Sequence, residues 1–166
     1  TMENLVIRNN TSTSNGGGLF LGSGADVSMS NSKIIGNSAS HSGGGVHLFA
    51  WSELSMSNVE ITGNTTTHDG AGVYANWDDN ILTLVNCTVG GNTSSANNKY
   101  ALYWEGDDNT LTIVNTIIWN PGLSSIYMDT DGGWDDQVIN VAGSVIQGGI
   151  AGGISTDDAG NVDQNI

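Results

Sequence analysis

The chain has 166 residues, of which 17 are acidic and 3 are basic, giving a formal net charge of −14. This balance excludes nucleic acid and anionic membrane surfaces as partners, because both are bound through clustered lysine and arginine. With 37% hydrophobic residues and 24 glycines, the composition is typical of an all-β repeat rather than a disordered chain. No apolar run approaches the roughly 20 residues of a membrane-spanning helix, so we expect no membrane insertion.

A repeat of 27 to 29 residues runs along the chain. Its segments begin at Asn4, Asn31, Asn58, Asn86, Asn115 and Gly143. Three residues into each segment stands an apolar side chain, which is Ile7, Ile34, Ile61, Val89, Ile118 or Ile146. Six residues in, four segments have a second asparagine, which is Asn10, Asn37, Asn64 or Asn92.

Each segment continues with further regular features. A glycine cluster occupies residues 16–18, 43–45 and 70–72, the last with Ala71 at its centre. A second apolar column follows, made of Leu19, Val46, Val73, Ala101, Ile126 and Ile154. A third holds Val27, Leu54, Leu82, Leu111 and Ile139, and two residues further on come Met29, Met56, Leu84, Ile113 and Val141.

Two segments depart from the pattern. The fourth has Asn98-Lys99-Tyr100 in place of the glycines, and the fifth has Pro121-Gly122 in place of the second asparagine. We expect the glycine and asparagine columns to break at these points.

The repeat predicts three short strands per segment, because apolar and polar residues alternate and successive side chains of a strand face opposite sides. Stacked turns would bury the inward residues in one continuous core. A helical solenoid needs apolar spacing over ten or more residues, and a propeller blade needs about 40 residues, so both are excluded. The sequence therefore predicts an all-β fold, a right-handed parallel β-helix of about six coils spanning residues 1–166 as one domain.

The asparagine and glycine columns have a structural interpretation. At a corner between strands, a side-chain amide can bond to the equivalent amide or a carbonyl one turn away and so satisfy groups that would otherwise be buried unpaired. The glycines supply positive φ or a close approach of backbones. We therefore assign neither column to a ligand.

Two stretches resemble a known family. Ile34-Ile-Gly-Asn37 before Gly43-Gly-Gly-Val46, and Ile61-Thr-Gly-Asn64 before Gly70-Ala-Gly-Val73, resemble the paired repeats of polymorphic outer-membrane proteins. Isoleucine replaces their phenylalanine, so the chain is similar to the wider group of bacterial surface proteins with pectate-lyase-like folds. The resemblance implies an extracellular or outer-membrane location. The tail from Asn115 to Gln164 is similar to their closing coils, so we expect a fragment of a larger surface or secreted protein.

Enzymes of that group need either a base beside calcium or a pair of carboxylates. The only bases are Arg8, Lys33 and Lys99, and Lys33 is expected to pair with Glu60 on the adjacent coil. The loops 78–79 and 107–108 carry stacked Asp-Asp pairs that could lie at the roughly 5 to 9.5 Å needed for glycoside hydrolysis. Asp-Asp-Asn is also ordinary turn chemistry. We therefore predict no catalytic residue and no enzyme activity.

One acidic loop is a candidate for calcium. Asp129, Asp131, Asp135 and Asp136 surround a glycine turn, a loose match to the oxygen-rich loops that bind Ca²⁺. The alternative is a solvated acidic loop. Three histidines, His41, His47 and His68, lack ligand spacing and are expected on the surface.

Aromatic residues form a candidate binding stripe. If Val46 and Val73 point inward, then Phe20, His47, Tyr74, Leu102 and Tyr127 point outward in one column. The candidate binding residues are Tyr74, Trp77, Trp104 and Tyr127, flanked by Asp78, Asp79, Glu105 and Asp107. Exposed aromatics on one face are unusual and could stack on sugars or dock a protein. The alternative is that neighbouring loops cover them.

Three functions follow as hypotheses. The first is a non-catalytic cell-surface module, adhesin-like or structural, that binds a glycan or a cell-surface protein. The second is a polysaccharide lyase, epimerase or hydrolase. The third is a self-assembling subunit, a homo-oligomer or an end-to-end filament, because unpaired strand edges invite pairing.

Overall fold

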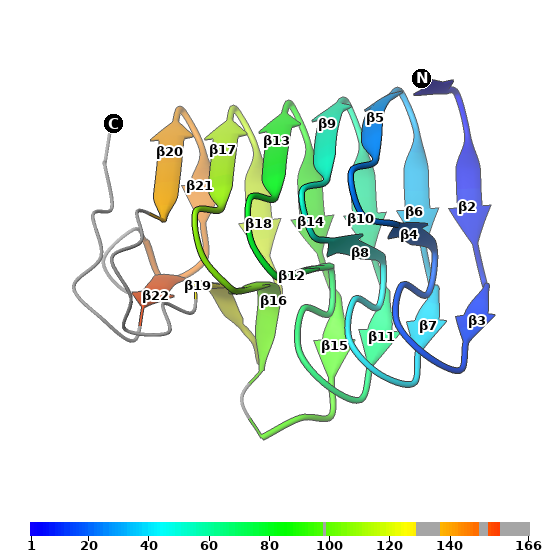
Figure 1. Cartoon of the computed structure of the whole chain (residues 1–166). Helices are drawn as coiled ribbons and strands as arrows, with labels where there is room; N and C mark the ends of the chain where they lie inside the picture. The colour runs from blue at the N-terminus through cyan, green and yellow to red at the C-terminus, as the bar shows by residue number, and fades with distance from the viewer. Residues whose placement is uncertain (98, 129–136, 150–152, 157–166) are drawn as a thin grey trace.

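The computed structural model describes residues 1–97, 99–128, 137–149 and 153–156. Its strands form a solenoid in which the coils stand side by side from β2 at one end to β21 at the other (Figure 1). Every strand pairs in parallel with the equivalent strand of a neighbouring coil. The all-β parallel solenoid expected from the repeat is therefore confirmed.

Four parallel sheets run along the solenoid. Sheet A contains β1 (Met2–Glu3), β5 (Asp26–Ser30), β9 (Glu53–Ser57), β13 (Ile81–Val85), β17 (Thr110–Val114) and β20 (Val138–Ala142). Sheet B contains β2 (Val6–Arg8), β6 (Lys33–Ile35), β10 (Glu60–Thr62), β14 (Thr88–Gly90), β18 (Ile117–Trp119) and β21 (Val145–Ile146). Sheet C contains β3 (Thr11–Ser12), β7 (Ser38–Ala39), β11 (Thr65–Thr66) and β15 (Thr93–Ser94). Sheet D contains β4 (Leu19–Leu21), β8 (Val46–Phe49), β12 (Val73–Asn76), β16 (Tyr100–Glu105), β19 (Ser124–Met128) and β22 (Ile154–Thr156).

Sheet C is an addition to the three strands expected in each coil. Its strands are two residues long, too short to show an alternation of apolar and polar residues. They follow directly on the second asparagine of each coil, where the chain turns toward the glycine cluster. Sheets A, B and D correspond to the three predicted strands.

The apolar columns form the core. Ile34, Ile61, Val89 and Ile118 are paired in register on sheet B, and all four are fully buried. On sheet A, Leu54, Leu82 and Leu111 form an equally buried column. The predicted pair is also present, with Lys33 Nζ 2.9 Å from Glu60 Oε2 on the outer side of sheet B.

The fourth coil differs from the prediction by one residue. Val73 pairs with Leu102, so Leu102 and not Ala101 belongs to the inward column of sheet D. The cause is an extra residue between the second asparagine and this strand, since Asn64 precedes Val73 by nine residues and Asn92 precedes Leu102 by ten. Ala101 instead continues the glycine column, and its carbonyl accepts from the Gly72 amide.

The asparagine ladder does not break at the fifth coil, so that prediction is wrong. Asn120 stands one residue earlier than expected, and its Oδ1 accepts from Nδ2 of Asn92 at 3.0 Å. Gln147 then extends the ladder, because its Oε1 accepts from the Asn120 amide at 2.8 Å. Pro121 and Gly122 follow the ladder position rather than replacing it.

Cys87 is buried, as expected from its place after the first asparagine column. Its thiol donates to the carbonyl of Val85 at 3.3 Å, and burial raises its pKa. In the next two coils, the hydroxyl groups of Thr116 and Ser144 occupy the equivalent position and donate to the carbonyl two residues earlier in the chain. In the part of the chain that the structure describes, no helix has the length and apolar character needed to cross a bilayer.

Candidate functional site

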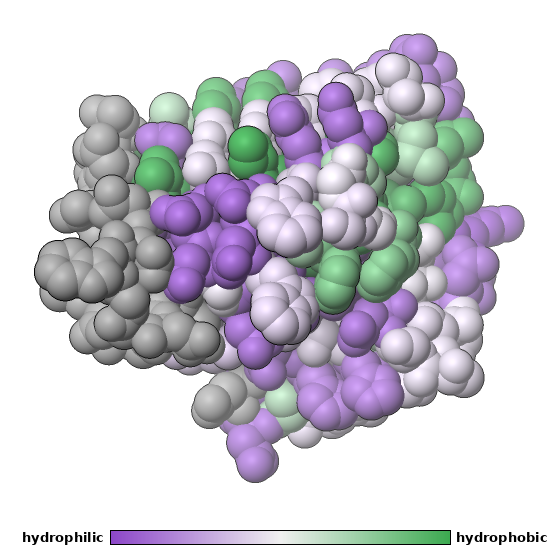
Figure 2. Space-filling model, viewed as in Figure 1, coloured by the Kyte–Doolittle hydropathy of each residue, from purple (hydrophilic) through white to green (hydrophobic). Residues whose placement is uncertain are grey.

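An outward aromatic column runs along sheet D. Its members are Phe20, His47, Tyr74, Tyr103 and Tyr127, paired across five coils. Neighbouring ring centroids lie 5.0, 5.1, 5.6 and 4.9 Å apart along the column. Tyr103 takes the place expected for Leu102, because the extra residue of the fourth coil moves Leu102 into the core. On this side, Figure 2 shows hydrophobic and weakly polar side chains beside a hydrophilic block nearer the C-terminal end.

His47 is fully buried within this column, so the expectation that it lies on the surface is wrong. Phe20 stacks on one side of the imidazole and Tyr74 lies on the other. Neither ring nitrogen has a hydrogen bond of good geometry with the described residues, although the Asn76 side chain lies close enough to interact with the ring. Burial lowers the pKa of His47 to about 4, and the nearby Asn76 amide opposes this shift only in part. His47 is therefore neutral at physiological pH.

His41 and His68 do lie on the surface, as expected. Their rings stack at 5.2 Å on consecutive coils, beyond sheet C. His68 is also the neighbour of Asp69, whose pKa is raised by burial, although the histidine opposes this shift.

Tyr74 is packed rather than freely exposed. Only 8% of the residue is accessible, and its hydroxyl donates to Oε2 of Glu105 on the next coil. Burial, reinforced by Glu105, raises the pKa of the phenol. Tyr103 and Tyr127 are half-buried. Much of the aromatic column is thus covered by neighbouring side chains. This agrees better with the alternative prediction, in which the aromatic residues are covered, than with a fully exposed stripe.

Trp104 does not belong to the outer surface, and its place among the candidate binding residues is a wrong prediction. It pairs with Ala75 and Met128 on the inward side of sheet D, and it is 0% exposed. The cause is again the extra residue of the fourth coil, because a shift by one residue exchanges the two faces of a strand.

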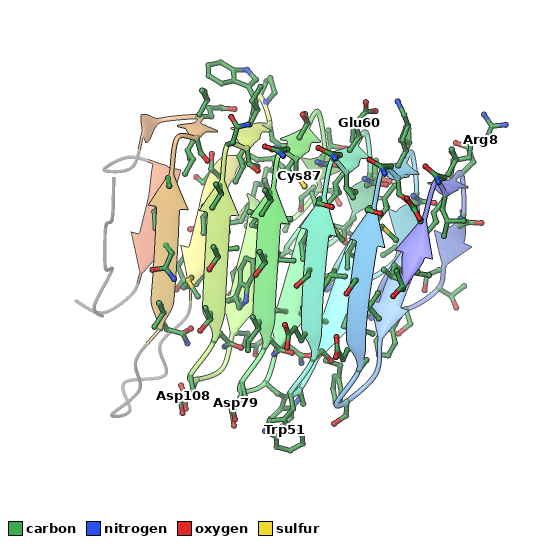
Figure 3. All side chains as sticks on the ribbon, turned by 90° about the horizontal axis from the view of Figure 1, so that it is seen from above. Arg8, Trp51, Glu60, Asp79, Cys87 and Asp108 are labelled. Atoms are coloured by element: carbon green, nitrogen blue, oxygen red, sulfur yellow. The ribbon has the colours of Figure 1, made fainter. Side chains whose placement is uncertain are left out.

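Two other tryptophans are strongly exposed at the corner between sheets D and A. Trp51 and Trp77 are 61% and 59% exposed and have φ angles of 57° and 65°. Nε1 of Trp51 donates to Oδ2 of Asp79 at 3.1 Å. Figure 3 shows Trp51, Asp79 and Asp108 along one edge, on the side of the solenoid away from Glu60 and Arg8.

A second amide ladder holds this corner in place. The Ser52 amide donates to Oδ1 of Asn80, and the Asn80 amide donates to Oδ1 of Asn109 at 2.8 Å. Nδ2 of Asn80 also donates to the carbonyls of Asn76 and Trp77, at 3.1 and 2.8 Å. Both asparagines are fully buried. The backbone that carries Trp77 is therefore fixed by side-chain bonds from beneath.

A solvent-open pocket of about 380 Å³ lies beside Trp77. Its walls are Asn76, Trp77, Asp78, Glu105, Gly106 and Asp107. The Asp107 amide donates to Oδ1 of Asp78 at 3.1 Å, which joins the two loops. Gly106 has a φ of 102°, and a Cβ there would meet the Trp77 backbone at 2.6 Å. Glycine is therefore required for the loops to stack this closely.

A family comparison agrees with this architecture. A family model described as a right-handed beta helix region matches residues 2–89, more than half of the chain. The chain belongs to the right-handed β-helix family. Comparison of this β-helix with curated proteins and with solved structures returned no match.

The predicted calcium ligands of the β-helix, Asp129, Asp131, Asp135 and Asp136, lie outside the described residues. Calcium binding there stays a prediction. Within the described ranges, no three His, Cys, Asp or Glu side chains are grouped in a way that would hold a metal ion.

The β-helix thus brings together part of the predicted stripe. Tyr74 and Tyr127 share the outer column, and Trp77 stands beside it at the corner. Sequence reasoning did not single out Asn76, Tyr103 or Gly106. Gly106 lies between Glu105 and an Asp-Asp pair, and a glycine in that position could have indicated a tight turn. No sequence pattern marks Asn76 as a pocket residue.

Proposed function

We propose that this β-helix is a non-catalytic binding module that holds a glycan in the pocket beside Trp77. The observation that carries the proposal is an indole 59% exposed at the rim of a polar pocket. An indole face packs on the apolar face of a sugar ring, while carboxylates, amides and carbonyls accept hydrogen bonds from its hydroxyl groups. The carboxylates of Asp78, Glu105 and Asp107 offer such acceptors on the pocket wall.

The rigidity of the corner supports this proposal. The Asn80 and Asn109 side chains anchor the loops, so a ligand would not have to order them on binding. Preorganisation of this kind lowers the entropic cost of association. The three carboxylates on the wall would repel a polyanion, so the proposal is restricted to neutral or amine-bearing glycans.

We also propose that the module works outside the cell, at a bacterial surface, as part of an adhesin-like or structural protein. One supporting observation is the resemblance of the repeat motifs to those of bacterial surface proteins. The other is that stability depends on stacked coils and not on a disulfide, because the lone Cys87 is buried and reduced.

The test is a screen of the purified chain against immobilised neutral, amine-bearing and acidic glycans, followed by calorimetry on any ligand found. Trp77→Ala should weaken binding by about tenfold or more, as expected for an aromatic anchor. Its melting curve should match that of the wild type, because the ring lies in solvent. Trp119→Ala, a tryptophan 53% exposed on sheet B, is the matched control and should bind normally.

Trp104→Ala separates binding from folding. The ring is fully buried, so its removal should destabilise the protein by about 3–5 kcal/mol. If Trp77→Ala binds as well as the wild type, the pocket is not the glycan site. Preferred binding of acidic glycans would also contradict the proposal.

The three carboxylates around one pocket favour hydrolysis as the second candidate function. Arg8 and Lys33 lie on sheet B, away from these loops, and cannot act as the base of a lyase there. Depolymerisation of a polysaccharide by the wild type, abolished in Glu105→Gln or Asp107→Asn, would replace the binding proposal by this one.

A further inference from the structure

The outer side of sheet B carries a second set of exposed apolar residues. Val6, Ile117, Trp119 and Val145 are 58%, 47%, 53% and 53% exposed. Ile117 and Val145 are direct neighbours on β18 and β21, whereas Val6 stands on β2 at the other end of the sheet. Exposed apolar residues gathered on one face indicate an interaction surface. This face is separate from the corner that holds Trp77.

The same face carries little negative charge. The strands of sheet B have three charged side chains, Arg8, Lys33 and Glu60, so two of the three bases of the chain lie here. Figure 3 shows Arg8 and Glu60 on the side opposite Asp79 and Asp108. The net charge of −14 makes two copies of the chain repel each other overall, and the strands of sheet A carry only acids, which are Glu3, Asp26 and Glu53. Charge therefore favours contact between copies on sheet B.

We propose that a second copy of this chain packs on the outer face of sheet B, about a twofold axis that runs along the strands between β10 and β14. Closed twofold dimers are the commonest assemblies of identical chains. Because this axis reverses the order of the strands, β2 of one copy faces β21 of the other, and β6 faces β18. The proposal is independent of the glycan site.

The order of side chains on the sheet fits this arrangement. Val6 meets Val145, and Ile35 meets Trp119, so both apolar ends of the face are covered. The aliphatic stem of Lys33 covers Ile117 while its ammonium group stays with Glu60. At the centre, Glu60 meets Thr88 and Thr62 meets Gly90, so no acid faces an acid.

The size of the face predicts a weak dimer. Strands about 4.8 Å apart place β2 and β21 about 24 Å from each other, with only three residues or fewer per strand. This area is below that of a standard stable interface, so dissociation should fall in the micromolar range or above. Sedimentation velocity over rising protein concentration should show a monomer–dimer equilibrium that stops at two copies.

Cysteine cross-linking tests the predicted pairing. In the Val6→Cys, Val145→Cys double variant, a bismaleimide reagent with a spacer of about 10 Å should give a covalent dimer, because the two positions meet across the twofold axis on sheets packed about 10 Å apart. Within one chain the two positions lie on β2 and β21, about 24 Å apart and beyond the reach of the reagent. Each single variant should stay uncross-linked. Cys87 is present in every variant, but it is buried and therefore should not react. Ile81→Cys with Val145→Cys, using an exposed position on sheet A, is the matched negative control.

A charge placed on the face gives the second test. Ile117→Glu should raise the dimer dissociation constant by roughly tenfold or more, whereas Ile81→Glu on sheet A should leave it unchanged. Circular dichroism should show both variants folded, because both side chains are exposed. A wild type that stays monomeric at every concentration, species larger than a dimer, or equal loss in both variants would overturn the proposal.

Discussion

At the scale of single residues, identical side chains have opposite roles according to the face on which they lie. Trp77 stands in solvent at a corner, and Trp104 fills the core. His47 is buried among aromatic rings, and His41 lies on the surface. Burial of the neutral imidazole means that protonation of His47 opposes folding.

His47 should make the protein lose stability in mild acid. The pKa is 6.5 in the reference state and about 4 in the folded protein, so the unfolded chain takes up the proton first as the pH falls. Above pH 6.5, His47 does not lower the free energy of unfolding. Between pH 6.5 and about pH 4, its titration lowers that free energy progressively, by about 3 kcal/mol in total. Urea unfolding across this window should show a smaller loss in His47→Phe than in the wild type. His41→Phe should behave as the wild type, and equal slopes in all three would contradict the prediction.

At the scale of elements, buried amide ladders join neighbouring coils in addition to the sheets. Asn64 is typical of them. Its Oδ1 accepts from the amide and from Nδ2 of Asn37, and its Nδ2 donates to the carbonyl of Ile34. Each asparagine thus satisfies groups of the preceding coil that the corner would otherwise bury without partners.

Asn64→Leu should therefore be strongly destabilising. It leaves the Asn37 amide and the Ile34 carbonyl without their bonds, and each such orphaned group costs about 1–3 kcal/mol. We expect a loss of about 3 kcal/mol or more in the free energy of urea unfolding. Asn58→Gly is the control, because Asn58 is exposed with a φ of 54° that glycine adopts freely, and its effect should be small. Similar losses in both variants would show that the ladder adds nothing specific.

At the scale of the whole molecule, one architecture extends past the part that the family model matches. The match covers residues 2–89, while the sheets A, B and D continue to β20, β21 and β22. The buried columns continue from coil to coil even where the residue type changes. Val89 follows Ile61 in one column, and Thr116 follows Cys87 in another. The net charge of −14 opposes this compact form by self-repulsion, so a bound cation would stabilise it.

Calcium should therefore raise the melting temperature if the loop with Asp129 and Asp131 binds it. A ligand that binds only the folded state stabilises it in proportion to the logarithm of its concentration. Added EDTA should lower the melting temperature of the wild type, and Asp131→Asn should remove the difference. Calorimetry without a calcium signal at millimolar concentration would end the prediction, and magnesium at equal concentration controls for general screening.

The sequence by itself determined the period, the parallel solenoid and most of the core. This was possible because each coil repeats the same inward residues, as Ile34, Ile61 and Val89 show, and because a parallel register places such equivalents directly on one another. The Lys33–Glu60 pair followed from the same register. The short strands of sheet C gave no pattern to detect.

Only the tertiary structure decided which side chains form the candidate site. One extra residue before Leu102 reverses the faces of β16, so that Tyr103 joins the aromatic column and Trp104 enters the core. Asn76 and Glu105 meet at one pocket because successive coils stack there, although they lie far apart in the chain. A repeat predicts what lies in register, but a single inserted residue changes the direction of every side chain after it until the register is restored.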